Sequence, residues 1–278
     1  MIESKKLLIV TDLDATLLTE DYSFHNARPA IHALKDRGFP IILNSSKTLA
    51  ELVPLARELD IHTPIIAENG GHIAIPKDLD LPINTEKFKP HGEYLTQILG
   101  LSRHRILEHS HALRIQHAYK FAGFADWSAE EISQHTGLSL ENAKLSADRY
   151  VTEPILWNDS EINWDIFKRS IESFGGRALR GGQFIHLMGT TDKADGLRYV
   201  RDIYRDSTPN TQWVTVALGD SANDRDMLNA SDIAVVIPHS DGPRINDPTA
   251  PQVIHAEHPA SRGWNDSILE ILSHHTSS

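Results

Sequence analysis

The stretch LLIVTDLD, residues 7–14, predicts a buried strand and the place where it ends. Its unbroken apolar run is typical of a strand covered on both faces of a parallel sheet. The run stops at Asp12 and Asp14, whose side chains point the same way because residues two apart on extended backbone share a face. Two carboxylates that close repel each other unless a cation lies between them. The stretch therefore predicts a cation-binding end on a buried strand.

Strands and helices alternate along the first and last thirds of the chain, with short connections between them. This alternation predicts a parallel α/β sheet. In the first third, helices are expected at residues 27–38 and 48–61, and further strands at 39–46 and 63–71. In the last third, the expected order is a helix at 193–204, a strand at 213–220, a loop and helix at 221–231, and a strand at 233–238.

The middle of the chain has a different character. Longer polar helices are expected at residues 124–137 and 139–148, and short strands at 150–157 and within 177–189. We therefore predict an α/β fold in which a Rossmann-like parallel-sheet core carries an inserted α+β cap domain. The core is expected to comprise residues 1–85 and 187–278, and the cap residues 86–186. An insertion after the third strand would lie at the carboxyl edge of the sheet, where open α/β sheets bind ligands.

The composition excludes several classes of protein. The chain has 278 residues, of which 40% are hydrophobic and 23% charged, as in an ordinary globular protein. Its formal net charge of −11 argues against general nucleic-acid binding and against docking on an anionic membrane. It has no cysteine, which excludes disulfides and thiolate metal sites. No long apolar run or signal-like segment is present, so we expect a cytoplasmic protein. We also expect a monomer or a weak homodimer that binds no nucleic acid and no membrane.

A second apolar strand also ends in acids. The segment VTVALGDSAND, residues 214–224, ends its strand at Asp220, with Asn223 and Asp224 close behind. Neighbouring parallel strands would bring Asp220 close to Asp12. Carboxylates gathered in this way suit Mg²⁺, which takes one or two of them and keeps its waters for a phosphate ligand. Taken separately, these acids could equally be turn or helix-capping residues.

Two further segments offer phosphate ligands. Ser45, Ser46 and Lys47 follow the expected strand at 39–46, and their hydroxyls, backbone N–H groups and ammonium could all bind phosphate oxygens. Lys193 begins a helix, where an ammonium can neutralise a transferring phosphoryl group. A lone lysine is more often a solvated charge, but here it follows the other motifs in order.

The ordered set DLDAT (12–16), a serine after the second strand, a lysine and GDSAND (219–224) resembles the haloacid dehalogenase superfamily of aspartate-nucleophile phosphatases. The resemblance implies that Asp12 attacks phosphorus to form an aspartyl phosphate and that Asp14 is the general acid and base. It also implies a Mg²⁺ site and a phosphate site. The metal site would be formed by Asp12, the backbone carbonyl of Asp14, Asp220 and Asp224, and the phosphate site by Ser45, Ser46, Lys193 and Asn223.

The expected cap and the turn ENGG (68–71) carry a narrower resemblance. Segments 65–76, 136–157 and 179–189 look like those of mannosyl-3-phosphoglycerate phosphatases, and the similarity extends over about residues 6 to 270. The chain departs from the family pattern at Asp148 and Gln183. The resemblance implies a glycosyl phosphoglycerate substrate, whose carboxylate Arg149 and Arg180 could bind as a fork and whose hydroxyls Glu153, Gln183 and His186 could bind. The full set of expected substrate contacts is Lys47, Glu68, Asn69, Arg149, Glu153, Arg180, Gly182, Gln183 and His186.

Other interpretations of the sequence stay open. The two arginines could be surface cations, and Glu68 with Asn69 could form a tight turn and nothing more. The substrate could carry mannose or glucose, or be another sugar phosphate. A phosphomutase or phosphotransferase would use the same core but pass the phosphoryl group to a sugar. A non-catalytic ligand sensor is a third class, against which the intact pair Asp12 and Asp14 argues.

Overall fold

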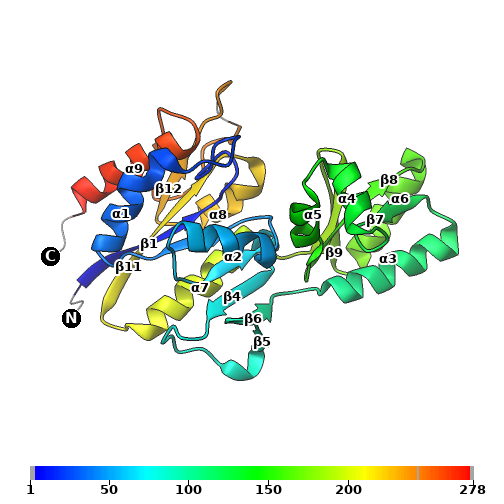
Figure 1. The fold of residues 1–278 in the computed structure, drawn as a ribbon, viewed down its shortest axis with the longest axis horizontal. Helices are drawn as coiled ribbons and strands as arrows, with labels where there is room; N and C mark the ends of the chain where they lie inside the picture. The colour runs from blue at the N-terminus through cyan, green and yellow to red at the C-terminus, as the bar shows by residue number, and fades with distance from the viewer. Residues whose placement is uncertain (1–3, 243, 276–278) are drawn as a thin grey trace.

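The computed structural model describes residues 4–242 and 244–275. Within them, the larger sheet has the strand order β13–β12–β11–β1–β2–β3–β4–β6–β5 (Figure 1). Its strands are β1 (Ser4–Thr11), β2 (Ile41–Asn44), β3 (Ile65–Ala67), β4 (His72–Pro76), β5 (Lys89–His91), β6 (Tyr94–Ile98), β11 (Thr211–Gly219), β12 (Ile233–Val236) and β13 (Gln252–His255). The strands from β13 to β3 are parallel, whereas β4, β6 and β5 are antiparallel to their neighbours. The α/β fold with a parallel-strand core is therefore confirmed.

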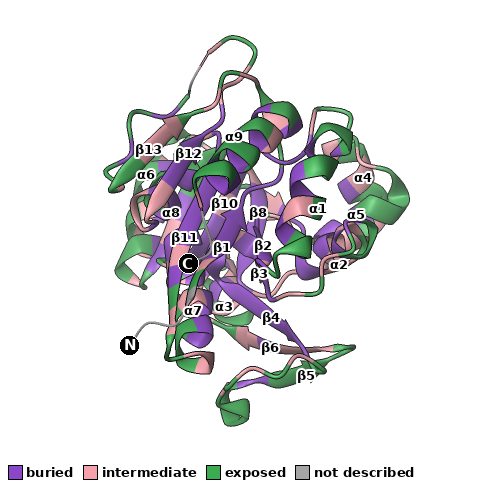
Figure 2. Cartoon of the chain, turned by 90° about the vertical axis from the view of Figure 1, so that its left-hand side faces the viewer, coloured by how far each residue is buried: buried purple, intermediate pink, exposed green. Residues whose placement is uncertain are grey.

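Strand β1 lies in the middle of this sheet and is buried on both faces (Figure 2). Leu7 and Ile9 pack into one apolar cluster, whereas Leu8 and Val10 pack into another on the opposite face. Residues from α1 (Arg28–Asp36), α2 (Leu49–Glu58) and α9 (Ala260–His274) fill the first cluster, and residues from α7 (Lys193–Ser207) and α8 (Arg225–Asn229) fill the second. This double burial is why the strand carries an unbroken apolar run.

The second sheet is smaller and antiparallel, with the order β7–β8–β10–β9. Its strands are β7 (Phe121–Gly123), β8 (Thr152–Trp157), β9 (Gly176–Gly181) and β10 (Phe184–Gly189). Helices α3 (Arg103–His117), α4 (Ala129–Thr136), α5 (Leu140–Ala147) and α6 (Glu161–Ser173) lie with it, to the right of the larger sheet in Figure 1. An aromatic cluster that includes Phe121, Trp164 and Phe167 gives this unit a hydrophobic core of its own.

The boundary between core and cap expected at residue 86 does not coincide with the end of the larger sheet. Strands β5 and β6 pair with the core through β4, so residues 89–98 extend the larger sheet. The polar character of this segment hid its strands, which form an exposed edge. We propose that the cap runs from α3 to β10 and that the chain crosses between the units near residues 99–102 and 189–192.

The remaining regular elements are short. They are the 3₁₀ turns η1 (His25–Ala27), η2 (Glu68–Gly70), η3 (Thr85–Lys87) and η4 (Ala222–Asp224). No helix in the described part of the chain is both long and apolar enough to cross a membrane.

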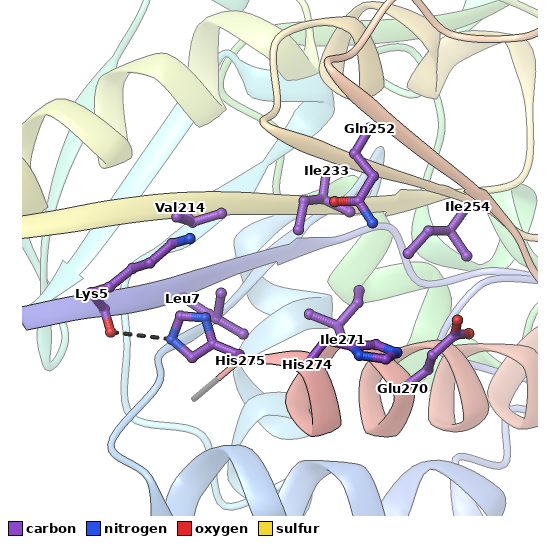
Figure 3. Close-up of a pocket in the computed structure, with 10 residues that line it drawn as sticks. All are labelled: Lys5, Leu7, Val214, Ile233, Gln252, Ile254, Glu270, Ile271, His274 and His275. Atoms are coloured by element: carbon purple, nitrogen blue, oxygen red, sulfur yellow. Dashed lines mark hydrogen bonds between the residues drawn. The ribbon is translucent and has the colours of Figure 1, made fainter. Parts of the chain in front are cut away.

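A small cavity of about 150 Å³ lies at the amino ends of the parallel strands (Figure 3). Leu7, Val214 and Ile233 form part of its apolar wall, and His275 closes one side with its Nε2 3.1 Å from the carbonyl oxygen of Lys5. The carboxylates singled out from the sequence follow the carboxyl ends of these strands, so this cavity is at the wrong edge to take part in their chemistry.

Candidate active site

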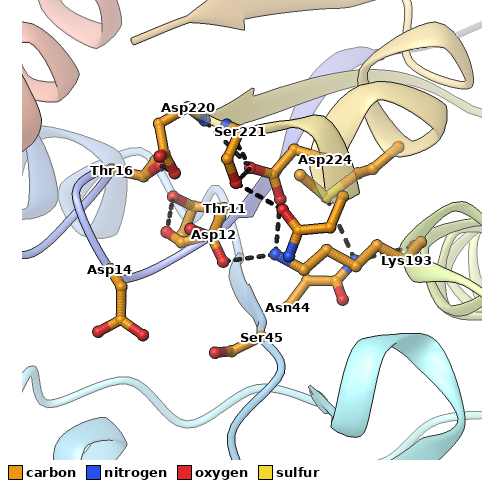
Figure 4. Close-up of polar contacts among 12 residues, drawn as sticks. Thr11, Asp12, Asp14, Thr16, Asn44, Ser45, Lys193, Asp220, Ser221 and Asp224 are labelled. Carbon is orange, nitrogen blue, oxygen red and sulfur yellow. Dashed lines mark hydrogen bonds and ion pairs between the residues drawn. The ribbon is translucent and has the colours of Figure 1, made fainter. Parts of the chain in front are cut away.

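Asp12 and Asp220 meet because their strands are neighbours. Strand β1 pairs in parallel with β11, and the N–H of Asp12 donates to the carbonyl oxygen of Leu218 over 3.0 Å. One carboxylate oxygen from each of Asp12, Asp220 and Asp224 lies within 4.8 Å of the others, and all three residues are buried (Figure 4). The sequence predicted this convergence from the strand ends, and the structure brings the three acids together.

Lys193 neutralises part of this negative charge. It is the first residue of α7, whose N-cap Asp192 accepts hydrogen bonds from the N–H groups of Ala194 and Asp195. Its Nζ lies 2.5 Å from a carboxylate oxygen of Asp12 and 2.5 Å from one of Asp224, and the side chain is only 1% exposed. Burial alone would lower the pKa of Lys193, but Asp12 and Asp224 raise it above its usual value. The site therefore holds a buried ammonium against the strand end.

The charge balance favours a divalent cation beside the three carboxylates. Burial raises the pKa of Asp12 well above its ordinary value, Lys193 opposes this effect, and Asp224 and Asp220 add to it. A further positive charge would reduce that penalty on the ionised form. The donor set is all oxygen and includes no thiolate, which suits a hard cation. The residues present thus fit the divalent metal that the sequence predicts.

Two residues that the sequence analysis did not single out hold Asp220. The hydroxyl of Thr16 donates to its Oδ1 over 2.9 Å, and Nε2 of His239 lies 2.6 Å from its Oδ2. Thr16 belongs to the DLDAT motif that was quoted, and His239 follows β12 just as Asp220 follows β11. The position of His239 shortly after the apolar run of β12 is therefore a sequence signal that indicates this site.

The turn after β11 is built around Asp224. One of its carboxylate oxygens contacts Lys193, and the other accepts from the N–H groups of Asp220 and Ser221, each over 3.1 Å. Asn223 accepts a hydrogen bond from the hydroxyl of Ser221. A further residue, Asn44 at the end of β2, donates its amide to the carbonyl oxygen of Lys193 over 2.9 Å. Asn44 precedes the predicted serines and was overlooked.

Asp14 lies apart from the three-carboxylate group. Its side chain is about half exposed and points away from Asp12 and Asp220 in Figure 4. Lys47 binds it, with Nζ 2.8 Å from Oδ2, and the Lys47 ammonium also lies 5.1 Å from the centre of the Tyr22 ring. Such a half-exposed acid is able to exchange protons with a ligand or with water.

A cleft of about 610 Å³ joins this strand edge to the cap. Ser45 is buried after the end of β2, whereas Ser46 lines the cleft. The predicted residues that line it are Ser46, Asn69, Arg180, His186, Lys193 and Asn223. Arg177 from β9 also lines it and was not predicted. Burial, with a contribution from Arg149, lowers the pKa of His186 to about 4, so its ring is neutral near pH 7 and can bind hydroxyls.

The two arginines expected to bind a carboxylate are differently placed. Arg180 is among the residues that line the cleft, but its side chain lies on the face of the cap sheet that meets α6, where it stacks on the Trp164 ring at 5.1 Å and binds Glu161 with one guanidinium nitrogen, 2.8 Å from each carboxylate oxygen. Arg149 donates to the carbonyl oxygen of Ser146 and to the hydroxyl of Thr152, both over 2.8 Å. Its guanidinium thus has protein partners, and it contributes charge next to His186.

Four other expected contacts are not among the residues that line the cleft. Glu68 is fully buried and binds the backbone of residues 150–152. Glu153 is buried against Arg103, at 2.7 Å, and burial raises its pKa although Arg103 opposes this. Gly182 has a φ of 60° in the β9–β10 turn, and Gln183 donates to the carbonyl oxygen of His135 over 2.5 Å. In this conformation the side chains of Glu68, Glu153 and Gln183 are engaged in structural contacts.

Comparison with known proteins agrees with this geometry. The family of haloacid dehalogenase-like hydrolases matches residues 9–242. The parallel-sheet core, the strand-end carboxylates and the buried lysine define a hydrolase of this kind, and the chain belongs to the haloacid dehalogenase-like hydrolase family.

Two curated relatives narrow the comparison. A protein of Methanococcoides burtonii is 37% identical over 268 residues, covering 96% of this chain and 97% of its own. A protein of Persephonella marina is 35% identical over 272 residues, with the same coverage of 96% and 97%. Each is named glucosyl-3-phosphoglycerate/mannosyl-3-phosphoglycerate phosphatase. The similarity therefore includes the cap as well as the core.

Solved structures support the fold. A Thermotoga maritima protein superposes with a TM-score of 0.64 at 14% identity, covering 99% of this chain and 98% of that one. A sugar phosphatase of subclass IIB in the same superfamily gives a TM-score of 0.61 at 16% identity, with coverage of 97% and 98%. At these identities the likeness shows the shared fold alone.

Proposed function

We propose that the chain is a Mg²⁺-dependent phosphatase that hydrolyses mannosyl-3-phosphoglycerate, or its glucosyl analogue, to the glycosylglycerate and phosphate. The observation that carries this proposal is the pair of curated relatives, which are 35–37% identical along 96% of the chain, cap included. The strand-end geometry supplies the chemistry, because Asp12, Asp220, Asp224 and Lys193 converge on one point.

In the first step, a carboxylate oxygen of Asp12 attacks phosphorus as the ester P–O bond breaks. Asp14 gives its proton to the leaving alkoxide, so the glycosylglycerate departs neutral at that oxygen. Lys193, held between Asp12 and Asp224, keeps positive charge next to the transferring group. Bound Mg²⁺ would neutralise the charge that develops on the phosphoryl oxygens.

In the second step, water attacks phosphorus of the aspartyl phosphate while Asp14 takes a proton from that water. Phosphate leaves and Asp12 returns to its carboxylate form, which closes the cycle. The exposure of Asp14 is compatible with this double role, since its half-exposed side chain is accessible to water, and it would leave Lys47 to act as the proton donor. We propose that Ser45 and Ser46 bind phosphoryl oxygens and that Asn223 completes this pocket.

Recognition of the glycerate carboxylate is proposed for Arg180. It is among the residues that line the cleft with Arg177 and His186, and its guanidinium would have to leave both Glu161 and the Trp164 ring and turn toward the cleft to bind a carboxylate as a fork. The neutral ring of His186 is suited to a sugar or glycerate hydroxyl.

The direct test is turnover. Purified protein with Mg²⁺ is assayed for phosphate release from mannosyl-3-phosphoglycerate, glucosyl-3-phosphoglycerate and a panel of common sugar phosphates. We expect kcat/KM for the two glycosyl phosphoglycerates to exceed that for the panel by about a hundredfold or more, because charged contacts contribute roughly 1.5–3 kcal/mol each. Higher kcat/KM for a simple sugar phosphate, or a phosphorylated sugar as product, would contradict the proposal.

A further inference from the structure

The turn between β3 and β4, residues Glu68–Gly71, joins the core to the cap. The Glu68 carboxylate reaches out of the core and accepts four hydrogen bonds from cap residues. The N–H of Tyr150 donates to Oε1 over 2.7 Å, and Oε2 accepts from the N–H groups of Val151 (3.1 Å) and Thr152 (2.9 Å). The Thr152 hydroxyl also donates to Oε2, over 2.6 Å. Both carboxylate oxygens of Glu68 are therefore used as acceptors for donor groups of the cap.

Both crossings between core and cap also contact this turn. The carbonyl oxygen of Gly71 accepts from the N–H of Leu99 over 2.8 Å, where the chain leaves the core. Where it returns, Asp192 packs so tightly on Gly70 that a Cβ there would meet its carbonyl oxygen at 1.8 Å. A Cβ on Gly71 would lie 2.7 Å from a Val151 methyl group. The turn therefore contacts both segments that connect the core to the cap, and it also contacts the cap itself.

The backbone of this turn is in an unusual conformation. Glu68 has a φ of 49° and Asn69 a φ of 56°, in the left-handed region that costs a non-glycine residue free energy. Asparagine adopts it readily, but glutamate does not, so a glutamate there needs a compensating interaction. The four hydrogen bonds to the cap provide one, and the residue is 0% exposed.

We infer that Glu68 is a positioning residue that fixes the cap over the active site, rather than a ligand of the substrate. Its carboxylate binds the backbone just before β8, the strand that pairs with the cleft-lining β10. The position of Arg180 and His186 relative to Lys193 then depends on this anchor. The consequence for specificity rests on the function proposed above, whereas the consequence for cap position does not.

The test uses Glu68→Gln, because the amide places an N–H₂ group against N–H donors while keeping the size of the side chain. The matched control is Asp126→Asn. Asp126 binds the Arg114 guanidinium with both oxygens at 2.9 Å and the N–H of Gly123 over 2.9 Å, so these partners all lie within the cap. Both variants lose a carboxylate that binds backbone and a side chain, but only Glu68 joins the cap to the core.

Cap position is measured directly. The natural chain has no cysteine, so Ile115→Cys in the cap and Asp202→Cys on α7 accept one spin label each. Both positions are exposed: residue Ile115 is 83% exposed, and the side chain of Asp202 is 62% exposed. Pulsed dipolar spectroscopy on the labelled protein should give a broader or displaced distance distribution with Glu68→Gln, and an unchanged one with Asp126→Asn. An unchanged distribution with folded Glu68→Gln would overturn the inference.

Kinetics give an independent reading. Glu68→Gln should lower kcat/KM for the glycosyl phosphoglycerate ten- to a hundredfold, mainly through KM, because fewer molecules hold the cap in the binding position. The kcat/KM for p-nitrophenyl phosphate should fall less than threefold. Equal losses on both substrates would assign Glu68 to the catalytic centre and contradict the inference. If the natural protein does not hydrolyse glycosyl phosphoglycerates, the proposed function fails, and the distance measurement still decides the role of Glu68.

Discussion

Asp12 is the residue on which the proposed chemistry depends most directly. It is buried at the end of β1 and held by Lys193, so exchange of one oxygen for an amide nitrogen changes its charge but little of its shape. We expect Asp12→Asn to lower turnover by about a thousandfold or more, because an amide cannot form the acyl phosphate. Phosphate release measures the loss, and thermal unfolding checks the fold. Substantial turnover by folded Asp12→Asn would rule out the covalent mechanism.

His239 offers a separate test of the metal site. Its ring lies 2.6 Å from Oδ2 of Asp220 and is placed to orient that carboxylate. Removal of groups that orient metal ligands typically weakens metal binding by roughly 10- to 100-fold. We therefore expect His239→Ala to weaken Mg²⁺ or Mn²⁺ binding by about that factor, measured by calorimetry, and Asp220→Ala to weaken it more. EDTA should stop turnover and added Mg²⁺ restore it.

The control for that experiment is His255→Ala, which removes a histidine paired with Asp247 on the surface. It should bind metal as the natural protein does. If His239→Ala also binds Mg²⁺ unchanged, the ring is a structural neighbour of Asp220 and has no part in orienting the metal ligand.

At the scale of elements, the β9–β10 hairpin is the part of the cap that reaches the cleft. Arg180 at its end binds Glu161 of α6, a half-exposed pair that contributes little to stability. Arg180→Ala should therefore leave the fold intact but cost about ten- to a hundredfold in kcat/KM for a glycosyl phosphoglycerate. The loss for p-nitrophenyl phosphate, which has no carboxylate, should be small.

Arg149→Ala distinguishes two uses of an arginine in the same cap. Arg149 stacks at 5.4 Å on the Phe124 ring and binds Thr152, so its removal should lower stability as well as activity.

For Arg180→Ala, equal losses of kcat/KM on the two substrates would mean that Arg180 supports the fold or the phosphate, and that another group binds the glycerate.

The elements that sequence reasoning found are those with a strong local pattern. The core strands carry unbroken apolar runs, and α2 and α7 begin with capping boxes at Thr48 and Asp192. Helix α3 was not predicted, because its surface is mostly polar and, of its residues, only Ile106, Ser110 and Leu113 are buried. Exposed strands such as β5 have no apolar alternation at all. Their structure is decided by pairing with a distant strand, which a local pattern does not contain.

Site residues divide in the same way. Asp12, Asp220 and Asp224 were predicted to converge because parallel strand ends meet at one edge, and Lys193 was added from the order of the motifs; the structure places the four together. Glu68 and Glu153 were expected to face the substrate, but the structure turns their carboxylates to the backbone of the cap and to Arg103. Sequence identifies an acid near a ligand site, whereas the direction of its side chain depends on packing between distant segments.

For the whole molecule, His72 makes stability depend on pH. It stacks on Tyr150 at 4.6 Å, and burial lowers its pKa to about 4, with His91 adding to the effect. An unfolded histidine, with a pKa of about 6.5, binds a proton at higher pH than the folded one. Between pH 6.5 and 4 the unfolded state holds more protons, so folding stability is full above this window and falls as the pH drops through it.

The expected loss from His72 between pH 7 and 4.5 is about 2.5 kcal/mol. Urea unfolding in metal-free buffer at the two pH values measures it. His72→Phe keeps a ring beside Tyr150 but does not titrate, so its stability should fall by about 2.5 kcal/mol less over the same interval. An identical acid loss in both proteins would place the pH dependence elsewhere.

The two places where the chain crosses into and out of the cap lie side by side. A Cβ on Gly100 would be 2.9 Å from a methyl group of Thr191, and one on Gly189 would be 3.1 Å from Leu101. The cap is thus a closed excursion that begins and ends at one point of the core, with an apolar cluster of its own. Such a cap can be replaced by a domain of a different size without moving the two core residues to which it is joined. A library of foreign caps spliced between residues 100 and 190 would keep one hydrolytic core and sample new substrates.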